Sequence, residues 1–179
     1  NMFDMRGETV SYDTERNKLI IIDQTKLPSV YVQKELDEPR EIADAIYKLE
    51  VRGAPAIGVA AAIGVAVTAE KIQEEESDEF FRKLKENAEI IRSARPTAVN
   101  LSWAVDEMLT AADEGRNNST KEIKKILTEK AKEIHKNDID CCRKIGENGA
   151  SLLEKSKAVL THCNAGRLAT VKYGTALAP

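Results

Sequence analysis

Aromatic residues are scarce in this chain. They make up 4% of its 179 residues, with a single tryptophan, whereas Ala, Val, Ile, Leu and the other apolar types bring the hydrophobic share to 42%. The core must therefore be built from small and aliphatic side chains, a composition that favours helices. Internal repeats and low-complexity tracts are absent from the sequence, so a solenoid or a disordered chain is not expected.

The sequence also lacks a surplus of positive charge. Its 27 Lys and Arg against 30 Asp and Glu give a formal net charge of −3, which argues against a nucleic-acid partner. The longest apolar run, Ala54 to Thr68, is shorter than the roughly 20 residues that span a bilayer, so we expect a buried helix and no membrane partner. The first residues show no secretory signal, and we expect a cytoplasmic protein.

Cysteine is rare and is not arranged for metal binding. The three cysteines show no Cys-x-x-Cys spacing, so we expect no structural metal, and their odd number is typical of a reducing compartment. Cys141 and Cys142 fall in an apolar helical pattern and are predicted to pack in the core. His135, in the same pattern, is predicted to lie on the helix surface or to have a structural partner.

The first 154 residues predict a small sheet followed by helices. Two strands of a hairpin are expected at Val10 to Tyr12 and Lys18 to Asp23, with a possible third at Val30 to Val32. Helices are expected to start near Pro39, Pro55, Ser77, Pro96 and Ser119. Ser119 and Glu122 form a capping-box pattern, and the last helix should run to Gly146 or Gly149.

The last 25 residues have a different character. Lys157 to Cys163 is an apolar run of strand length, Asn164 to Gly166 is a turn, and Leu168 to Leu177 can form a helix. A strand, a turn and a helix normally open a parallel sheet. We therefore expect two domains, 1–154 and 155–179, the second being the start of a sheet domain completed elsewhere in a longer protein.

Two arginines lie at expected helix starts. Arg52 and Gly53 precede one helix and Arg95 precedes another, where exposed backbone N–H groups and a guanidinium favour an anion such as a phosphate. The alternative for Arg52 is an ordinary turn in which Gly53 supplies a positive φ. The alternative for Arg95 is an ion pair at a helix boundary.

Cys163 is the third candidate. It would lie at the carboxyl end of the expected strand, where α/β sheets bind ligands, and a following helix would stabilise its thiolate. His162 would point to the opposite face of the strand and is not its base. The alternative is a small buried side chain.

Together the motifs resemble a known family. VRGAPAIGVAAAIGVAV (51–67), RPTAVNLSWAVDEML (95–109) and LTHCNAGRLATVKYGTALAP (160–179) resemble, in this order, the methylthioribose-1-phosphate isomerases of methionine salvage. LIIIDQTKLP (19–28) is also similar. The resemblance covers most of this chain but only the first half of the family's usual length.

The resemblance implies an α/β fold, with a hairpin-plus-helices domain before a Rossmann-like domain. It implies an aldose–ketose isomerase that converts 5-methylthioribose 1-phosphate into 5-methylthioribulose 1-phosphate, without a cofactor and as a homodimer. It assigns substrate binding to Arg52, Gly53, Ala54 and Arg95, and catalysis to Cys163. The family's catalytic aspartate has no counterpart here, so we expect this chain alone to lack full activity. Arg167 differs from the usual alanine and is a possible extra anion contact.

Two rival functions remain open, and a third alternative is a helical fragment with no independent function. Ribose-1,5-bisphosphate isomerase has a related fold and a substrate with a second phosphate. A regulatory subunit of the translation-initiation nucleotide-exchange factor has the same architecture and acts through protein contacts. The intact HCNAG string favours the enzyme, because a binding module has no chemical need for the thiol of Cys163.

Overall fold

A three-stranded antiparallel sheet begins the structure. The computed structural model describes residues 7–179, and the N-terminal residues 1–6, part of the stretch inspected for a secretory signal, lie outside them. Strands β1 (Val10–Asp13), β2 (Lys18–Ile22) and β3 (Gln33–Leu36) pair in the order β1-β2-β3. The predicted hairpin is confirmed, but the third strand lies C-terminal to the expected Val30 to Val32. Pairing of Leu36 with Leu19 buries both side chains, whereas Val30 is 54% exposed.

Five α-helices follow the sheet. They are α1 (Pro39–Tyr47), α2 (Ala54–Glu70), α3 (Ser77–Arg92), α4 (Val99–Glu114) and α5 (Thr120–Leu153). The capping box of Ser119 and Glu122 is confirmed at the start of α5. This helix continues past the expected end at Gly146 or Gly149. Helix α4 starts later than expected from Pro96, because the N–H of Ala98 first closes a turn onto the carbonyl of Arg95.

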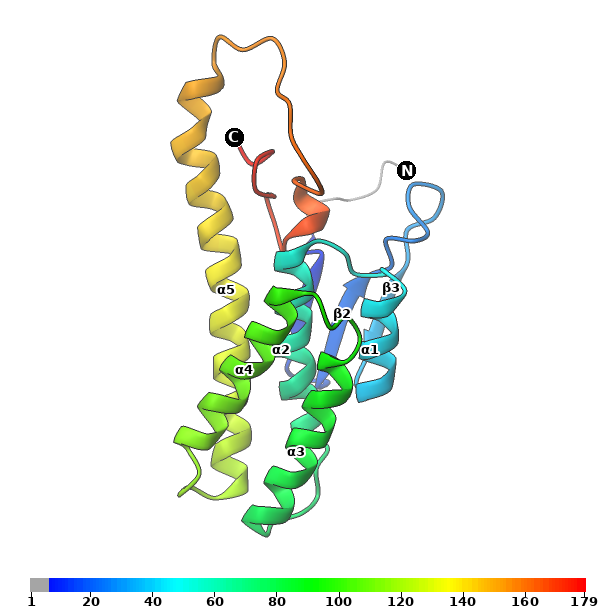
Figure 1. Cartoon of the computed structure of the whole chain (residues 1–179), viewed down its shortest axis with the longest axis vertical. Helices are drawn as coiled ribbons and strands as arrows, with labels where there is room; N and C mark the ends of the chain where they lie inside the picture. The colour runs from blue at the N-terminus through cyan, green and yellow to red at the C-terminus, as the bar shows by residue number, and fades with distance from the viewer. Residues whose placement is uncertain (1–6) are drawn as a thin grey trace.

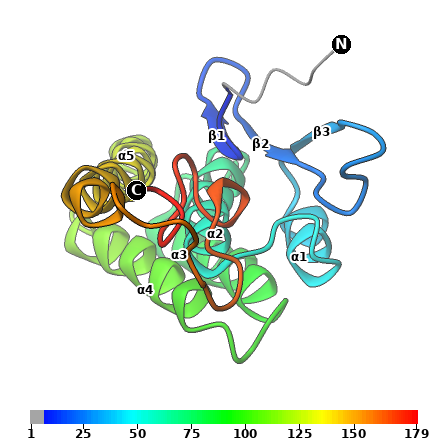
Figure 2. The ribbon, with the colours of Figure 1, turned by 90° about the horizontal axis from the view of Figure 1, so that it is seen from above.

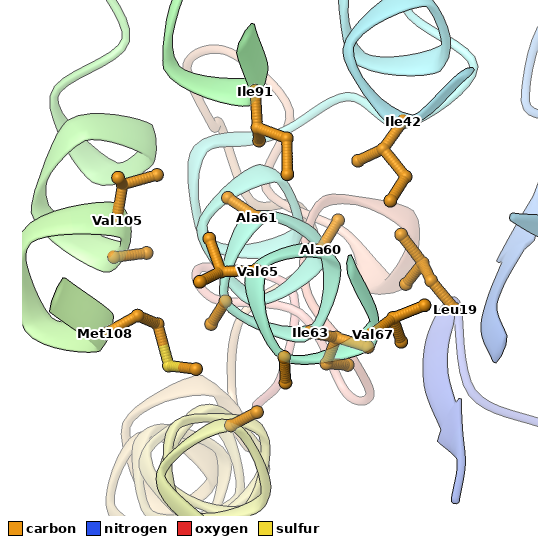
Figure 3. Packing of buried hydrophobic residues seen from close by; sticks show 14 of the residues in the cluster. Leu19, Ile42, Ala60, Ala61, Ile63, Val65, Val67, Ile91, Val105 and Met108 are labelled. Atoms are coloured by element: carbon orange, nitrogen blue, oxygen red, sulfur yellow. The ribbon is translucent and has the colours of Figure 1, made fainter. Parts of the chain in front are cut away.

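Helix α2 is the centre of the molecule. Fourteen of its 17 residues are buried, so it is apolar on every side, as predicted for Ala54 to Thr68. It packs against the other four α-helices and against β1 and β2 (Figures 1 and 2). Its small residues allow close approach: a Cβ on Gly64 would lie 3.1 Å from Cγ2 of Ile42. Figure 3 shows Ile42, Ile91 and Met108 pointing toward it from three surrounding helices.

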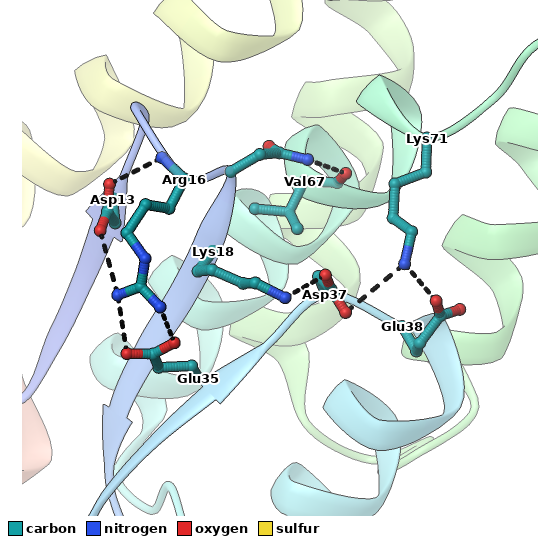
Figure 4. A network of polar contacts seen from close by, with 9 residues as sticks. Asp13, Arg16, Lys18, Glu35, Asp37, Glu38, Val67 and Lys71 are labelled. Atoms are coloured by element: carbon teal, nitrogen blue, oxygen red, sulfur yellow. Dashed lines mark hydrogen bonds and ion pairs between the residues drawn. The ribbon is translucent and has the colours of Figure 1, made fainter.

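Polar contacts attach the outer face of the sheet to the end of α2. Arg16 forms an ion pair with Glu35, and Lys18 with Asp37, which also faces Lys71 after α2 (Figure 4). The pair of Arg16 and Glu35 is exposed and contributes little stability, whereas Lys18 and Asp37 are half-buried. Within the same network, the Nδ2 of Asn17 donates to the carbonyl of Val67 at 2.9 Å.

The C-terminal segment, defined here as residues 154–179, is mostly irregular. Neither the strand expected at Lys157 to Cys163 nor the helix expected at Leu168 to Leu177 forms in this described stretch, and both predictions were wrong. The segment holds only the 3-10 helix η1 (Arg167–Ala169). Leu160 is 99% exposed, and no neighbouring strand within residues 7–179 pairs with its backbone. An apolar run without a strand to pair with cannot form a ladder.

The α/β class is confirmed, with one small antiparallel sheet and surrounding helices. The start of a Rossmann-like sheet and the domain division at 154/155 stay predictions. After α5 the chain turns back toward the start of α2, where the candidate site lies (Figure 1). Within residues 7–179, no helix has the length and apolar character needed to cross a membrane.

Candidate functional site

A close backbone contact shapes the start of α2. Gly53 is the N-cap residue of this helix, with φ +100°. A Cβ at this position would lie 2.4 Å from the Cα of Ala169 in η1, so only glycine fits. The first N–H to bond back within this turn belongs to Ile57, which reaches the carbonyl of Gly53 at 3.0 Å. The earlier N–H groups, including that of Ala54, have no partner within the helix and suit an anion, while Pro55 supplies none.

Arg52 is held beside this helix start. Its Nη2 donates to the backbone oxygen of Gln24 at 3.1 Å, and the rest of the exposed guanidinium is available to a ligand. Gln24 is buried, and its Nε2 donates to the backbone oxygen of Leu168 at 2.8 Å. The segment after β2 therefore connects the start of α2 to the C-terminal segment.

One cavity lies between these elements. It has a volume of about 610 Å³, and its walls include Gln24, Arg52, Thr161, Cys163, Arg167 and Ala169. The structure thus brings together Arg52 and Cys163, which the sequence singled out separately. Such a volume lies in the usual range for small-molecule sites.

Cys163 lies in the cavity wall on an irregular loop. Its side chain is exposed, so the alternative of a small buried residue is wrong. The helix expected after it is replaced by the three-residue η1, which removes the proposed dipole stabilisation of its thiolate. Its backbone has φ +63°, uncommon for a residue with a side chain. Strain of this kind clusters at functional sites.

Arg95 lies outside the walls of this cavity. It is half-buried in the connection between α3 and α4. That connection is at the same end of the molecule as the cavity, because α4 starts beside the start of α2 (Figure 1). A Cβ on Gly58 of α2 would lie 3.1 Å from the carbonyl oxygen of Asn100 in α4, which measures how closely the two helix starts pack.

Arg167 has a structural partner. Its guanidinium donates to the backbone oxygen of Gly7, so at least one edge is not available as the extra anion contact that the sequence suggested. The carbonyl of Arg167 also accepts from the Oγ1 of Thr9 at 3.4 Å. Arg167 thus helps fasten the C-terminal segment to the residues before β1.

Polar residues that sequence reasoning missed hold the same segment from the other side. Asp138 of α5 accepts from the N–H of Val171 at 2.7 Å, and the N–H of Thr9 donates to the Val171 carbonyl at 2.9 Å. Burial raises the pKa of Asp138, although the hydrogen bond from Val171 and the charge of His135 act in the opposite direction. Gln24 lies in the string LIIIDQTKLP (19–28), but that string assigns it no role, and no motif marks Asp138.

His135 and the paired cysteines have structural places. The Nε2 of His135 lies 2.9 Å from the Oε2 of Glu8, and this hydrogen bond lowers the pKa of that carboxyl against the effect of burial. The prediction that His135 has a structural partner is confirmed. Cys142 is buried as predicted, and burial raises the pKa of its thiol to about 11. Cys141 is exposed, so its predicted core position is wrong, because it lies on the outer face of α5.

Comparison with known proteins gives consistent results. The model of the Initiation factor 2 subunit family matches residues 50–176. A protein named 5-deoxyribose 1-phosphate isomerase from Clostridium botulinum is 49% identical over 170 residues, which are 95% of this chain and 49% of the relative. A methylthioribose-1-phosphate isomerase from Geotalea uraniireducens is 45% identical over 161 residues, 90% of this chain and 46% of the relative.

Two solved structures share the fold. The 5-methylthioribose 1-phosphate isomerase from Pyrococcus horikoshii superposes with a TM-score of 0.88 and 36% identity, over 96% of this chain and 48% of that one. A translation initiation factor eIF-2B subunit delta from A. fulgidus gives 0.85 and 44% identity, over 96% and 49%. The chain therefore spans about half the length of these relatives.

Proposed function

The chain belongs to the Initiation factor 2 subunit family. From its similarity to relatives named as sugar-phosphate isomerases and from the cavity described above, we propose that the full-length protein is a sugar-phosphate aldose–ketose isomerase. The observation that carries the proposal is that Arg52, beside the N-terminus of a 17-residue helix, and Cys163 line one cavity. A phosphate ligand and a group for proton transfer are the minimum that such an isomerase needs within a few ångströms of each other.

The proposed roles follow from position and charge. The phosphate binds at the start of α2, held by the guanidinium of Arg52 and the N–H groups of Gly53 and Ala54. Arg95, from the neighbouring connection, contacts the sugar or the phosphate once the substrate is bound. Cys163 serves the reacting carbons, as an acid or base or by stabilising developing charge.

The chemistry is an internal oxidation and reduction. The bond between C1 and the ring oxygen breaks, that oxygen takes a proton, and one hydrogen moves from C2 to C1. C2 becomes the ketone and loses its hydroxyl proton, while C1 becomes a CH₂ that keeps its phosphate. Electrons balance within the substrate, so the reaction requires no redox cofactor. Transfer through an enediolate and transfer by a hydride shift both satisfy this balance.

The substrate we propose is 5-methylthioribose 1-phosphate, which places the reaction in methionine salvage. Curated relatives are named either methylthioribose-1-phosphate isomerase or 5-deoxyribose 1-phosphate isomerase. These substrates differ only in the group on C5, a methylthio group or a hydrogen, and the phosphate end is common to both. The second was not among the sequence-based alternatives, and it joins ribose 1,5-bisphosphate as a candidate. We further propose a cytoplasmic homodimer with a Rossmann-like second domain after residue 154.

The test uses the full-length protein with each of the three sugar phosphates, followed by proton and phosphorus-31 NMR. We expect conversion of 5-methylthioribose 1-phosphate to the ketose, and a loss of about 10²-fold or more in Cys163→Ala. The matched control is Cys141→Ala, an exposed thiol on α5 outside the cavity, which should keep wild-type turnover. Equal turnover in Cys163→Ala and wild type would contradict the role of the thiol.

The second candidate is a non-catalytic subunit that acts through protein contacts. The likeness to the A. fulgidus structure named as an eIF-2B subunit favours it. Such a protein should convert none of the three sugars and should be indifferent to Cys163→Ala in partner binding. Turnover of any of the three by the wild type would exclude this candidate.

A further inference from the structure

Gln24 is a buried polar residue that contacts both sides of the cavity. Its side chain is 1% exposed. Its backbone N–H donates to the carbonyl of Glu50 at 3.0 Å, and its own carbonyl accepts from Arg52. Its Nε2 donates to the carbonyl of Leu168, which lies 144 residues further along the chain. One residue thus touches the phosphate side and the thiol side of the site.

The local sequence directs this side chain inward. Strand β2 ends at Ile22, and Asp23 closes a turn by accepting from the N–H of Thr25 at 3.0 Å. Gln24 lies inside that turn, and a buried primary amide is costly unless it is hydrogen-bonded. The bond to Leu168 therefore fixes the side chain of Gln24 and the loop that it holds.

This bond differs in kind from the contact of Gly53 with Ala169. The contact of Gly53 with Ala169 is steric: it limits how closely the two backbones approach. It does not fix their relative orientation, because neither residue has a polar side chain. The amide of Gln24 gives direction, since a hydrogen bond weakens steeply with misalignment. Leu168 lies in η1, five residues after Cys163, and among the described contacts with the Arg52 side of the cavity its carbonyl is the anchor nearest to Cys163 along the chain.

We propose that Gln24 is a positioning residue that sets the placement of Cys163 relative to Arg52. The proposal rests on the isomerase function proposed above and adds a residue to which the family resemblance assigned no role. Gln24 acts through the backbone of Leu168 and is not itself a catalytic group. Misplacement of a reacting group by about 1 Å is enough to slow an enzyme 10²-fold.

Gln24→Met removes the hydrogen bond to Leu168 and keeps the one to Arg52. Methionine has a similar volume and leaves the backbone carbonyl that holds Arg52, but it has no amide donor for Leu168. In full-length protein we expect kcat to fall about tenfold or more, with KM changed less than about twofold. Gln24→Asn, whose amide is one methylene too short, should shift kcat in the same direction. The control Gln73→Met replaces an exposed glutamine whose Nε2 donates to the carbonyl of Lys71, and it should match wild type.

Alkylation gives a readout that does not need turnover. Inorganic phosphate bound at Arg52 should slow the reaction of Cys163 with iodoacetamide, followed by mass spectrometry of the peptides. Exposed Cys141 on the same chain is the internal control and should react at one rate throughout. We expect protection of at least about threefold in wild type and in Gln73→Met, and at most half of that factor in both Gln24 variants.

The outcomes separate this proposal from the function. Wild-type kcat and wild-type protection in folded Gln24→Met would overturn the positioning role, as would a KM that rises in proportion to the fall in kcat. Absence of phosphate protection in wild type would also overturn it, because Arg52 and Cys163 would then not share a ligand site. If no sugar is converted but protection is lost only in the Gln24 variants, the isomerase fails and the positioning role stands.

Discussion

Helix α2 and the C-terminal segment meet at the cavity but are held in place by different forces. The helix is buried on every side, among aliphatic residues from all four other helices. The segment buries only a few residues, among them Ala165, Ala169 and Val171. Hydrogen bonds to Gln24, Asp138 and Thr9 fix its position.

The two kinds of contact control different properties: apolar burial controls the stability of the fold, and hydrogen bonds control the geometry of the cavity. Burial of apolar surface is roughly additive and indifferent to direction, so α2 determines whether the domain folds. A few directional bonds determine where the loop of Cys163 lies, and local opening of such a segment requires far less free energy than global unfolding. Substitutions in α2 should therefore destabilise the whole fold, whereas substitutions at the contacts of the C-terminal segment should have smaller, local effects.

The largest effect should come from the core. Ile63→Ala removes a fully buried side chain of α2 and should lower the free energy of unfolding by about 3 kcal/mol, because it leaves a cavity among well-packed neighbours. Urea unfolding followed by circular dichroism measures this. Val99→Ala, at a side chain 78% exposed, is the control and should stay within about 0.5 kcal/mol of wild type. Similar losses in the two variants would mean that α2 is not the centre of stability.

A smaller and local effect is expected at the contact between the two regions. Gly53→Ala places a Cβ against the backbone of Ala169 at a φ of +100°. The resulting strain should destabilise the docked state by about 2 kcal/mol, and undocking of the C-terminal segment would relieve it. Tryptic cleavage after Arg167 and Lys172 should then accelerate about tenfold or more. Gly7→Ala is the matched control, because a Cβ there meets nothing within 4 Å. Unchanged cleavage in Gly53→Ala would show that the contact does not hold the segment.

The smallest effect, a pH dependence, distinguishes two carboxyls that flank the segment. The pKa of Asp138 is raised above its ordinary 3.8, so its favourable contribution to stability is complete below that value and is lost as pH rises through the raised pKa. The pKa of Glu8 is lowered from 4.5, so its contribution is present above 4.5 and is lost as pH falls through the lowered pKa.

Variants at the two carboxyls should therefore differ in sign. Going from about pH 3 to about pH 7, the stability of Asp138→Asn should rise relative to wild type, and that of Glu8→Gln should fall relative to wild type. Urea unfolding at both pH values measures the two differences. Equal signs would show that burial of Asp138 does not outweigh its bond to Val171.

The sequence predicted the apolar half of this comparison well. Helical spacing, the glycine and proline positions and the capping box at Ser119 located the helices, because those features act over a few residues. The C-terminal segment was predicted wrongly for the opposite reason. Lys157 to Cys163 has the composition of a strand, but a strand needs a partner, and the sequence pattern cannot supply one.

The candidate site divides in the same way. Arg52 and Cys163 could be predicted from the sequence, because each lies in a short motif whose residue types indicate a chemical role. Gln24 and Asp138 act through backbone groups far along the chain, at Leu168 and Val171, and backbone acceptors and donors have no identity in a sequence. Only the folded chain shows which carbonyl a buried amide reaches.

The packing of Gly53 on Ala169 has a consequence for the walls of the cavity. Two main chains in contact have no rotamers to choose among, so this contact fixes how closely η1 approaches the start of α2, and the bond of Gln24 gives that approach its direction. Side chains of the cavity wall can therefore be exchanged without changing the distance between these two backbones.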